Sequence, residues 1–214
     1  MGARVRRRKA GVRQSKEVIA FLSEGEVTEP EYVRMLRGHY GIPAGLVKHI
    51  KTGKSNPLGI VREAVKRKKD NIRRAAKDEE VLVNEWWVLF DTEGSRHPHA
   101  RIPEALRLAE ANEIRVAMSD PSFELWLLLH FRYTTRQYLD ADETITDLRK
   151  EMPEYRADHK YPSSARLMER VDNALENAER LRRWREGAKG LSSWTDVDRF
   201  VTQALRFAGS CERA

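Results

Sequence analysis

The chain has 214 residues, of which 40% are hydrophobic and 34% are charged, a balance typical of a folded domain and unlike that of a disordered chain. Its longest uninterrupted apolar runs, such as residues 125–129, are far shorter than the about 20 residues that cross a bilayer. The basic N-terminus leads into no signal-peptide apolar segment, so we expect a cytoplasmic protein with no membrane partner. The single cysteine, Cys211, excludes an intrachain disulfide and a cysteine-rich zinc site.

The net charge of +7 is concentrated at the N-terminus. Residues 1–16 contain seven basic side chains and no acidic one, so the rest of the chain is neutral overall. We expect residues 1–16 to form a flexible basic tail, which either contacts a phosphate backbone or is simply solvated. The basic side chains of this tail are Arg4, Arg6, Arg7, Arg8, Lys9, Arg13 and Lys16.

The first predicted elements are a strand and a helix. Residues 18–22 (VIAFL) form a short apolar run of the kind found in buried strands. Thr28 stands before Glu29, Pro30 and Glu31, a pattern that predicts a capping box at the start of a helix running to about residue 40. The two glutamates would then lie beside the helix N-terminus, where the dipole favours negative charge.

A second strand is predicted at residues 46–50, followed by a loop and a strongly basic helix at 57–77. Gly53, Lys54 and Ser55 resemble the end of a Walker A loop, but Lys48 stands where that pattern requires glycine. We therefore expect Lys54 to contact a phosphate without an ATP site. Apolar residues recur at close to the helical period through 57–77, and the opposite face is mostly basic, which favours binding to a polyanion. The predicted nucleic-acid contacts are Lys54, Arg62, Lys66, Arg67, Lys69 and Arg73.

Four more elements follow in the same alternation. A third strand is predicted at residues 85–90 (EWWVLF), a helix at about 102–112, and a fourth strand at 114–118 (IRVAM). Asp120 and Pro121 are then expected to cap a helix that continues to about residue 131. Alternating strands and helices predict an α/β fold, with a parallel sheet of about four strands flanked by helices.

The C-terminal third has a different pattern. Strand signals fade after residue 133, and the clearest apolar stripe is helical: Leu167, Val171, Leu175, Ala178 and Leu181. We therefore divide the chain into a tail at 1–16, an α/β domain at 17–133, and a helical extension at 134–214 that packs on the domain.

Acidic side chains follow the first and third predicted strands. Glu24 and Glu26 come after the first strand, and Asp91 and Glu93 come at the end of the third. In open α/β sheets, ligands bind outside the carboxyl ends of the strands. Each of these carboxylates alone is consistent with a solvated turn residue. Together, at two strand ends, they predict a site for Mg²⁺ or Mn²⁺, which take oxygen ligands, and such an ion can also bind a phosphate oxygen.

Glu124 is a further candidate because it lies in an otherwise apolar helix. A carboxylate in that setting either emerges at the surface or finds a partner. Since the helix begins beyond the fourth strand, Glu124 is placed to face the same crevice, and we predict it as a catalytic residue together with Glu24. His130 is predicted to be structural, and His97 and His99 give little support for a ligand pair.

Three segments carry a resemblance to a known family. Residues 23–32 (SEGEVTEPEY), 87–91 (WVLFD) and 119–131 (SDPSFELWLLLHF) resemble motifs of the RloB family. Two shorter segments, 53–57 (GKSNP) and 195–197 (TDV), lie where that family has short motifs. The resemblance therefore extends over most of the chain, in order.

The resemblance implies a Toprim-like fold and an association with bacterial restriction or phage-defence gene clusters. Toprim domains hold Mg²⁺ for phosphodiester chemistry with a glutamate after the first strand and an Asp-x-Asp motif after the third. Glu24 matches the glutamate and Asp91 the first aspartate. Glu93 stands in place of the second aspartate, which keeps the charge and lengthens the side chain by one methylene.

These observations support one leading hypothesis and two others. The leading hypothesis is a metal-dependent nuclease, or a related phosphodiester-acting enzyme, in a bacterial defence system. In that case Asp91 and Glu93 hold the ion and Glu24 handles a proton or a second ion. The alternatives are a non-catalytic nucleic-acid-binding module and an interaction subunit that binds other defence proteins.

Overall fold

The computed structural model describes residues 17–96, 98–155, 164–187 and 192–209. The predicted basic tail, 1–16, lies outside these residues. The first part of the chain alternates strictly: β1 (Ile19–Ser23), α1 (Thr28–His39), β2 (Val47–His49), α2 (Pro57–Ala75), β3 (Glu85–Asp91), α3 (Ile102–Ala111), β4 (Arg115–Asp120) and α4 (Glu124–Leu129). The second part contains α5 (Ala141–Glu151), α6 (Ser164–Met168), α7 (Val171–Gly187), β5 (Trp194–Thr195) and α8 (Val197–Leu205).

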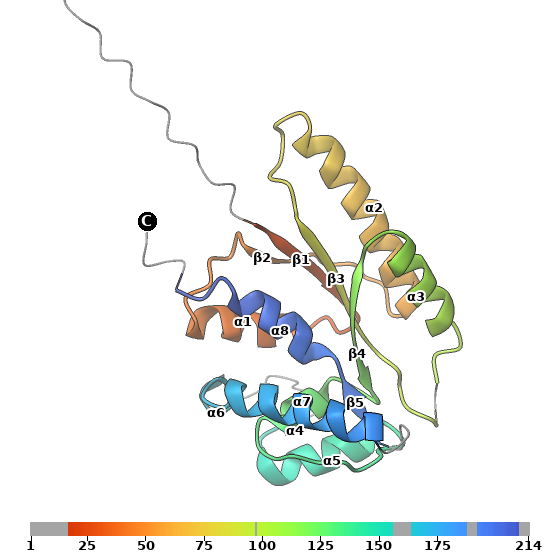
Figure 1. The fold of residues 1–214 in the computed structure, drawn as a ribbon, viewed down its shortest axis with the longest axis vertical. Coiled ribbons are helices and arrows are strands. Elements are labelled where there is room, and N and C mark those ends of the chain that lie inside the picture. The colour runs from red at the N-terminus through yellow and green to blue at the C-terminus, as the bar shows by residue number, and fades with distance from the viewer. Residues whose placement is uncertain (1–16, 97, 156–163, 188–191, 210–214) are drawn as a thin grey trace, which may run out of the picture.

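The strands form one sheet in the order β2-β1-β3-β4-β5 (Figure 1). β1, β2, β3 and β4 pair in parallel, and β5 pairs antiparallel to β4. The predicted α/β class is thus confirmed. The short β5 was not predicted, because two residues carry no periodic pattern and the strand forms only by pairing with β4.

Alternate side chains of the strands face two separate cores. Ile19 and Phe21 of β1 belong to one buried cluster, and Ala20 and Leu22 belong to the other. Both faces of a parallel sheet are covered, so its strands appear as continuous apolar runs. Helices α2 and α3 cover one face, and α1 and α8 cover the other (Figure 1).

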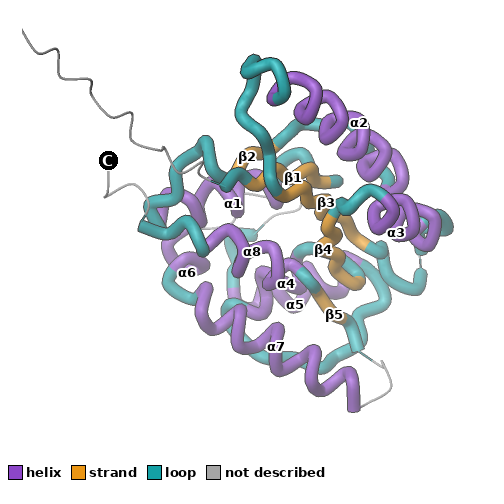
Figure 2. The backbone as a smooth tube through the Cα atoms, turned by 45° about the horizontal axis from the view of Figure 1, so that its top comes forward, coloured by secondary structure: helices purple, strands orange, loops and turns teal. Residues whose placement is uncertain are grey.

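The C-terminal helices share the larger core with the sheet. That core joins residues of β1, β3 and β4 to buried side chains of α4 to α8, and the same helices lie on one side of the sheet in Figure 2. The predicted stripe lies on α6 and α7, where Leu167, Val171, Ala178 and Leu181 are buried. Within the residues that the structure describes, no helix is both long and apolar enough to cross a bilayer.

Two predicted helix starts are wrong in detail. Helix α1 begins at Thr28 itself, and no side chain caps it. Helix α4 begins only at Glu124, and Asp120 is the last residue of β4 instead of a cap. The Asp120 carboxylate accepts a hydrogen bond from the Thr92 hydroxyl at 2.5 Å. The side chain of Asp120, which would otherwise cap a helix, is thus used at the carboxyl edge of the sheet.

Candidate metal centre

Glu24 lies where β1 ends, next to the end of β3. The two strands are paired, with Ser23 opposite Leu89, and the N–H of Glu24 donates to the Leu89 carbonyl at 2.9 Å. The Glu24 carboxylate turns back over the sheet edge, where Oε2 is 3.4 Å from the N–H of Asp91. Burial raises the pKa of Glu24 to about 7; the Asp91 N–H opposes this shift and the Glu93 carboxylate adds to it.

Glu29 also belongs to this site, and the sequence reasoning missed it. Only 4% of Glu29 is exposed, and its Oε1 accepts a hydrogen bond from the N–H of Gly25 at 3.0 Å. A side chain at Gly25 would meet this carboxylate, since a Cβ there would lie 2.0 Å from Oε2 of Glu29. Helical periodicity does carry the signal: Glu29 precedes the buried Tyr32 and Val33 by one turn.

Asp91 lies at the centre of the acidic group. Burial raises the pKa of Asp91 well above its ordinary value, and the carboxylates of Glu29, Glu124 and Glu24 raise it further. A hydrogen bond from the N–H of Phe123 opposes these effects. Three carboxylates around a fourth repel one another unless protons or a cation offset the charge.

Glu124, a predicted catalytic residue, lies close enough to Asp91 to affect its charge. It is 4% exposed, acts electrostatically on Asp91, and accepts a hydrogen bond from the Tyr155 hydroxyl at 2.7 Å. His130, six residues later, points elsewhere. Its Nε2 lies 3.1 Å from the Tyr32 hydroxyl and its Nδ1 lies 2.9 Å from the Trp126 carbonyl, as expected of a neutral structural histidine.

Glu93 lies on a tight turn beyond β3. Its backbone has a left-handed φ of 63°, and Gly94 follows with a φ of 73°. The N–H of Glu93 donates to the Pro121 carbonyl at 3.0 Å, and the N–H of Thr92 donates to Ser119 at 2.9 Å. The turn is thus fixed to the connection between β4 and α4.

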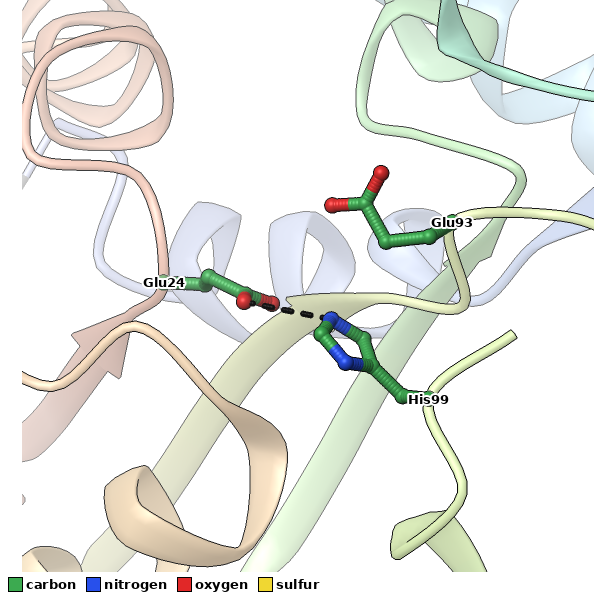
Figure 3. A group of neighbouring side chains, drawn as sticks. All are labelled: Glu24, Glu93 and His99. Atoms are coloured by element: carbon green, nitrogen blue, oxygen red, sulfur yellow. Dashed lines mark ion pairs between the residues drawn. The ribbon is translucent and has the colours of Figure 1, made fainter. Parts of the chain in front are cut away.

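The turn brings Glu93 beside Glu24 and a residue that was not predicted, His99 (Figure 3). One ligand atom from each of these three side chains lies within 4.8 Å of the others. Nε2 of His99 is 3.4 Å from Oε1 of Glu24. The predicted ligands Asp91 and Glu93 therefore lie in two adjoining groups that share Glu24: Glu93 with His99, and Asp91 with Glu29 and Glu124. His97 is outside the described residues.

A small cavity of about 120 Å³ opens beside Glu24, between the end of β1 and the loop after β2. Lys51 and Lys54 line it, together with Thr52, whose buried hydroxyl has no hydrogen-bond partner within the described part of the chain. Lys54 also lines a second pocket with Arg62, at the start of α2. Cationic side chains thus adjoin the acidic group.

The other predicted nucleic-acid contacts lie along α2. Three of the basic side chains pair with carboxylates: Arg62 with Glu104, Arg67 with Glu63, and Arg73 with Asp70. Lys66 and Lys69 are exposed. Because α2 connects two parallel strands, its N-terminus lies near the carboxyl edge of the sheet and its C-terminus lies far from that edge (Figure 1).

These residues fit a divalent cation. Oxygen ligands from carboxylates suit hard cations. The raised pKa values of Glu24 and Asp91 have their main cause in burial, and neighbouring carboxylates contribute. A bound cation would relieve the repulsion among these groups.

Comparison with known proteins gives one match. The family of RloB-like proteins matches residues 19–203, which include every residue of the acidic group. No curated protein and no solved structure matches the chain. The chain therefore belongs to the RloB-like protein family.

Proposed function

We propose that this protein is a metal-dependent nuclease, or a related phosphodiester-acting enzyme, of a bacterial defence system. The observation that carries the proposal is the carboxylate group at the carboxyl edge of the sheet. Asp91 is surrounded there by Glu24, Glu29 and Glu124. These three carboxylates add to the effect of burial in raising the pKa of Asp91, and a bound cation would offset their charge.

Mg²⁺ or Mn²⁺ would be held by Glu24, Asp91 and Glu93. When bound, such an ion offsets the negative charge that builds on a phosphoryl group and its leaving oxygen. Without the ion, burial raises the pKa of Glu24 to about 7, and where Asp91 and Glu93 alone hold the ion, Glu24 would be free to exchange a proton near neutral pH, as a general acid or base must. Tyr155 and the N–H of Phe123 orient the carboxylates of Glu124 and Asp91.

The cations next to the acidic group support nucleic acid as the substrate. Lys51 and Lys54 line the cavity beside Glu24, and Lys54 and Arg62 line the adjoining pocket. A phosphodiester backbone that enters along the start of α2 would place its phosphates against these side chains. The resemblance of residues 23–32 and 87–91 to the RloB family supports a Toprim-like site and the defence role.

Cleavage of nucleic acid tests the proposal. Purified protein is incubated with DNA and with structured RNA in Mg²⁺ or Mn²⁺, with and without EDTA. We expect cutting that EDTA stops and that Glu24→Gln reduces by at least a hundredfold, the range found for positioned acid–base groups. Glu110→Gln, the same change at an exposed glutamate on α3, should leave cutting unchanged.

Two results would count against the nuclease. Cutting that survives in Glu24→Gln and in Asp91→Asn would point to a contaminant. Salt-dependent nucleic-acid binding without cutting, in protein that has bound the metal, would favour the non-catalytic binding module.

A further inference from the structure

His99 and Glu24 approach each other at the distance of two ligands on one ion. Nε2 of His99 lies 3.4 Å from Oε1 of Glu24. Two ligand atoms that are each about 2.1 Å from a common ion lie roughly 3.0–3.4 Å apart, depending on the coordination geometry. The third member, Glu93, also places a carboxylate oxygen within 4.8 Å of the other two atoms. The dashed contact in Figure 3 is therefore compatible with a shared ion.

The Nε2 atom of His99 makes no hydrogen bond to any residue that the structure describes. The atom is buried and has no hydrogen-bond partner among the described residues. Its contact with Glu24 has the distance of an ion pair but not the geometry of a hydrogen bond. Buried polar nitrogens are normally satisfied, so an unsatisfied one that faces two carboxylates indicates a missing partner. A cation satisfies Nε2 and both carboxylates at the same time.

The backbone holds His99 and Glu93 on one loop. Glu93 takes up a left-handed conformation with a φ of 63°, which costs a non-glycine residue roughly 1 kcal/mol or more. The N–H of His99 is 3.4 Å from the Thr92 carbonyl, so the loop folds back on the turn that carries Glu93. Strained backbone of this kind is found where side chains must converge on a ligand.

We propose that His99 is a nitrogen ligand of the ion and that the site therefore prefers a first-row transition-metal ion, with Mn²⁺ as its representative, over Mg²⁺. The proposal rests on the proposed function and specifies which ion serves the site. Imidazole nitrogen suits transition-metal ions, whereas Mg²⁺ favours oxygen donors and water. A site made of carboxylates alone would have a weaker preference of this kind.

Electron paramagnetic resonance of bound Mn²⁺ tests this assignment without an activity assay. The full-length protein is loaded with Mn²⁺, and electron spin echo modulation reports whether a nitrogen nucleus is coupled to the ion. We expect nitrogen coupling in the wild type and in His39→Ala, a histidine exposed at the end of α1. His99→Ala should lose the coupling and bind Mn²⁺ at least tenfold more weakly.

Competition with Mg²⁺ adds a second readout. His99→Asp replaces the nitrogen with oxygen and makes the ligand set all-carboxylate. We expect the excess of Mg²⁺ that displaces half of the Mn²⁺ to fall at least tenfold in His99→Asp relative to the wild type. A purely structural His99 would leave this ratio unchanged.

The outcomes separate the two proposals. Mn²⁺ that binds in a Glu24-dependent manner, without nitrogen coupling, would overturn the role of His99 and leave the proposed metal site standing. An unchanged competition ratio in His99→Asp would overturn it equally. A wild type that binds no Mn²⁺ would overturn both.

Discussion

Two aspartates illustrate two ways in which this fold accommodates a negative charge. Asp147, on α5, is 3% exposed and accepts hydrogen bonds from Arg132, Tyr138 and Lys150 at 2.6–2.8 Å. Burial alone would raise the pKa of Asp147, but these hydrogen bonds outweigh burial and lower it. The charge is compensated within the protein, so it stabilises the helical layer.

Asp91 has the opposite surroundings. Its neighbours are carboxylates, and burial together with their charge raises its pKa. A carboxylate held by cations stabilises the fold, whereas a buried carboxylate with a raised pKa among other carboxylates is a candidate for ligand binding. Substitutions at the two aspartates, and at other buried or strained residues, should therefore have different effects on stability.

Asp147→Asn should destabilise the protein by about 3 kcal/mol, because it removes the charge that a network of cations surrounds. Arg132 and Lys150 are partly exposed, so water can solvate them in the variant. The expected loss of stability is therefore at the low end of the range for buried ion pairs. Urea unfolding measures the effect. A loss below about 1 kcal/mol would mean that the network contributes as little as a surface ion pair.

His130 gives a third case, in which a buried ionisable group remains neutral. Burial lowers the pKa of His130 to about 4, so between pH 6.5 and 4 the unfolded chain binds the proton and the folded chain does not. The free energy of unfolding should be at its full value above about pH 6.5 and should decrease as the pH falls, by about 2 kcal/mol at pH 5.

The control for this prediction is His130→Gln, which cannot take up the proton. Unfolding free energies of wild type and variant are measured from pH 8 to pH 5. The carboxylates at the sheet edge also titrate, but they do so in both proteins. Parallel curves for the two proteins would contradict the neutral His130.

Asp91→Asn should stabilise the protein, whereas Asp147→Asn should destabilise it. When the pKa of a carboxyl group is raised in the folded state, the free energy of unfolding falls as the pH rises towards that pKa. At pH 8 the metal-free wild type is therefore destabilised by the charge of Asp91, and the variant is not. We expect Asp91→Asn to be more stable than the wild type by about 1 kcal/mol, the ordinary scale of a single substitution. Adding Mn²⁺ should stabilise only the wild type strongly. A variant less stable than the wild type in EDTA would contradict the repulsion at this site.

Glu93→Gly should raise the free energy of unfolding by about 0.5 kcal/mol. Glycine relieves the left-handed strain of about 1 kcal/mol, and the greater freedom of the unfolded chain offsets part of the gain. Glu93→Ala is the matched control, because it also removes the carboxylate but retains the strain. If Glu93→Ala proves to be the more stable variant in thermal unfolding, the strain assigned to this turn is wrong.

Much of the fold could be predicted because local patterns and tertiary packing agree. Strands such as β1 and β3 are continuous apolar runs, and helices such as α2 have clear periodicity. The exceptions depend on long-range contacts. β5 forms only against β4, and α4 starts late because Asp120 accepts a hydrogen bond from Thr92 instead of capping a helix.

The site was predicted less completely than the fold. Glu24, Asp91 and Glu93 follow strand ends, so strand order alone places them at one edge of the sheet. Glu29 and His99 were missed for different reasons. Glu29 lies in an apparent capping motif, so the sequence pattern assigned it to the helix N-terminus and not to the site. His99 joins the site only through the turn at Glu93, whose left-handed backbone is not specified by the residue type.

We propose that the carboxylates at the edge of the sheet hold a divalent cation. The most direct test is anomalous diffraction at the manganese absorption edge from crystals soaked in Mn²⁺. We expect an anomalous peak within about 2.0–2.6 Å of a Glu24 carboxylate oxygen, in contact with Asp91 or Glu93 and absent from crystals of Glu24→Gln. No peak between these residues at saturating Mn²⁺ would contradict it.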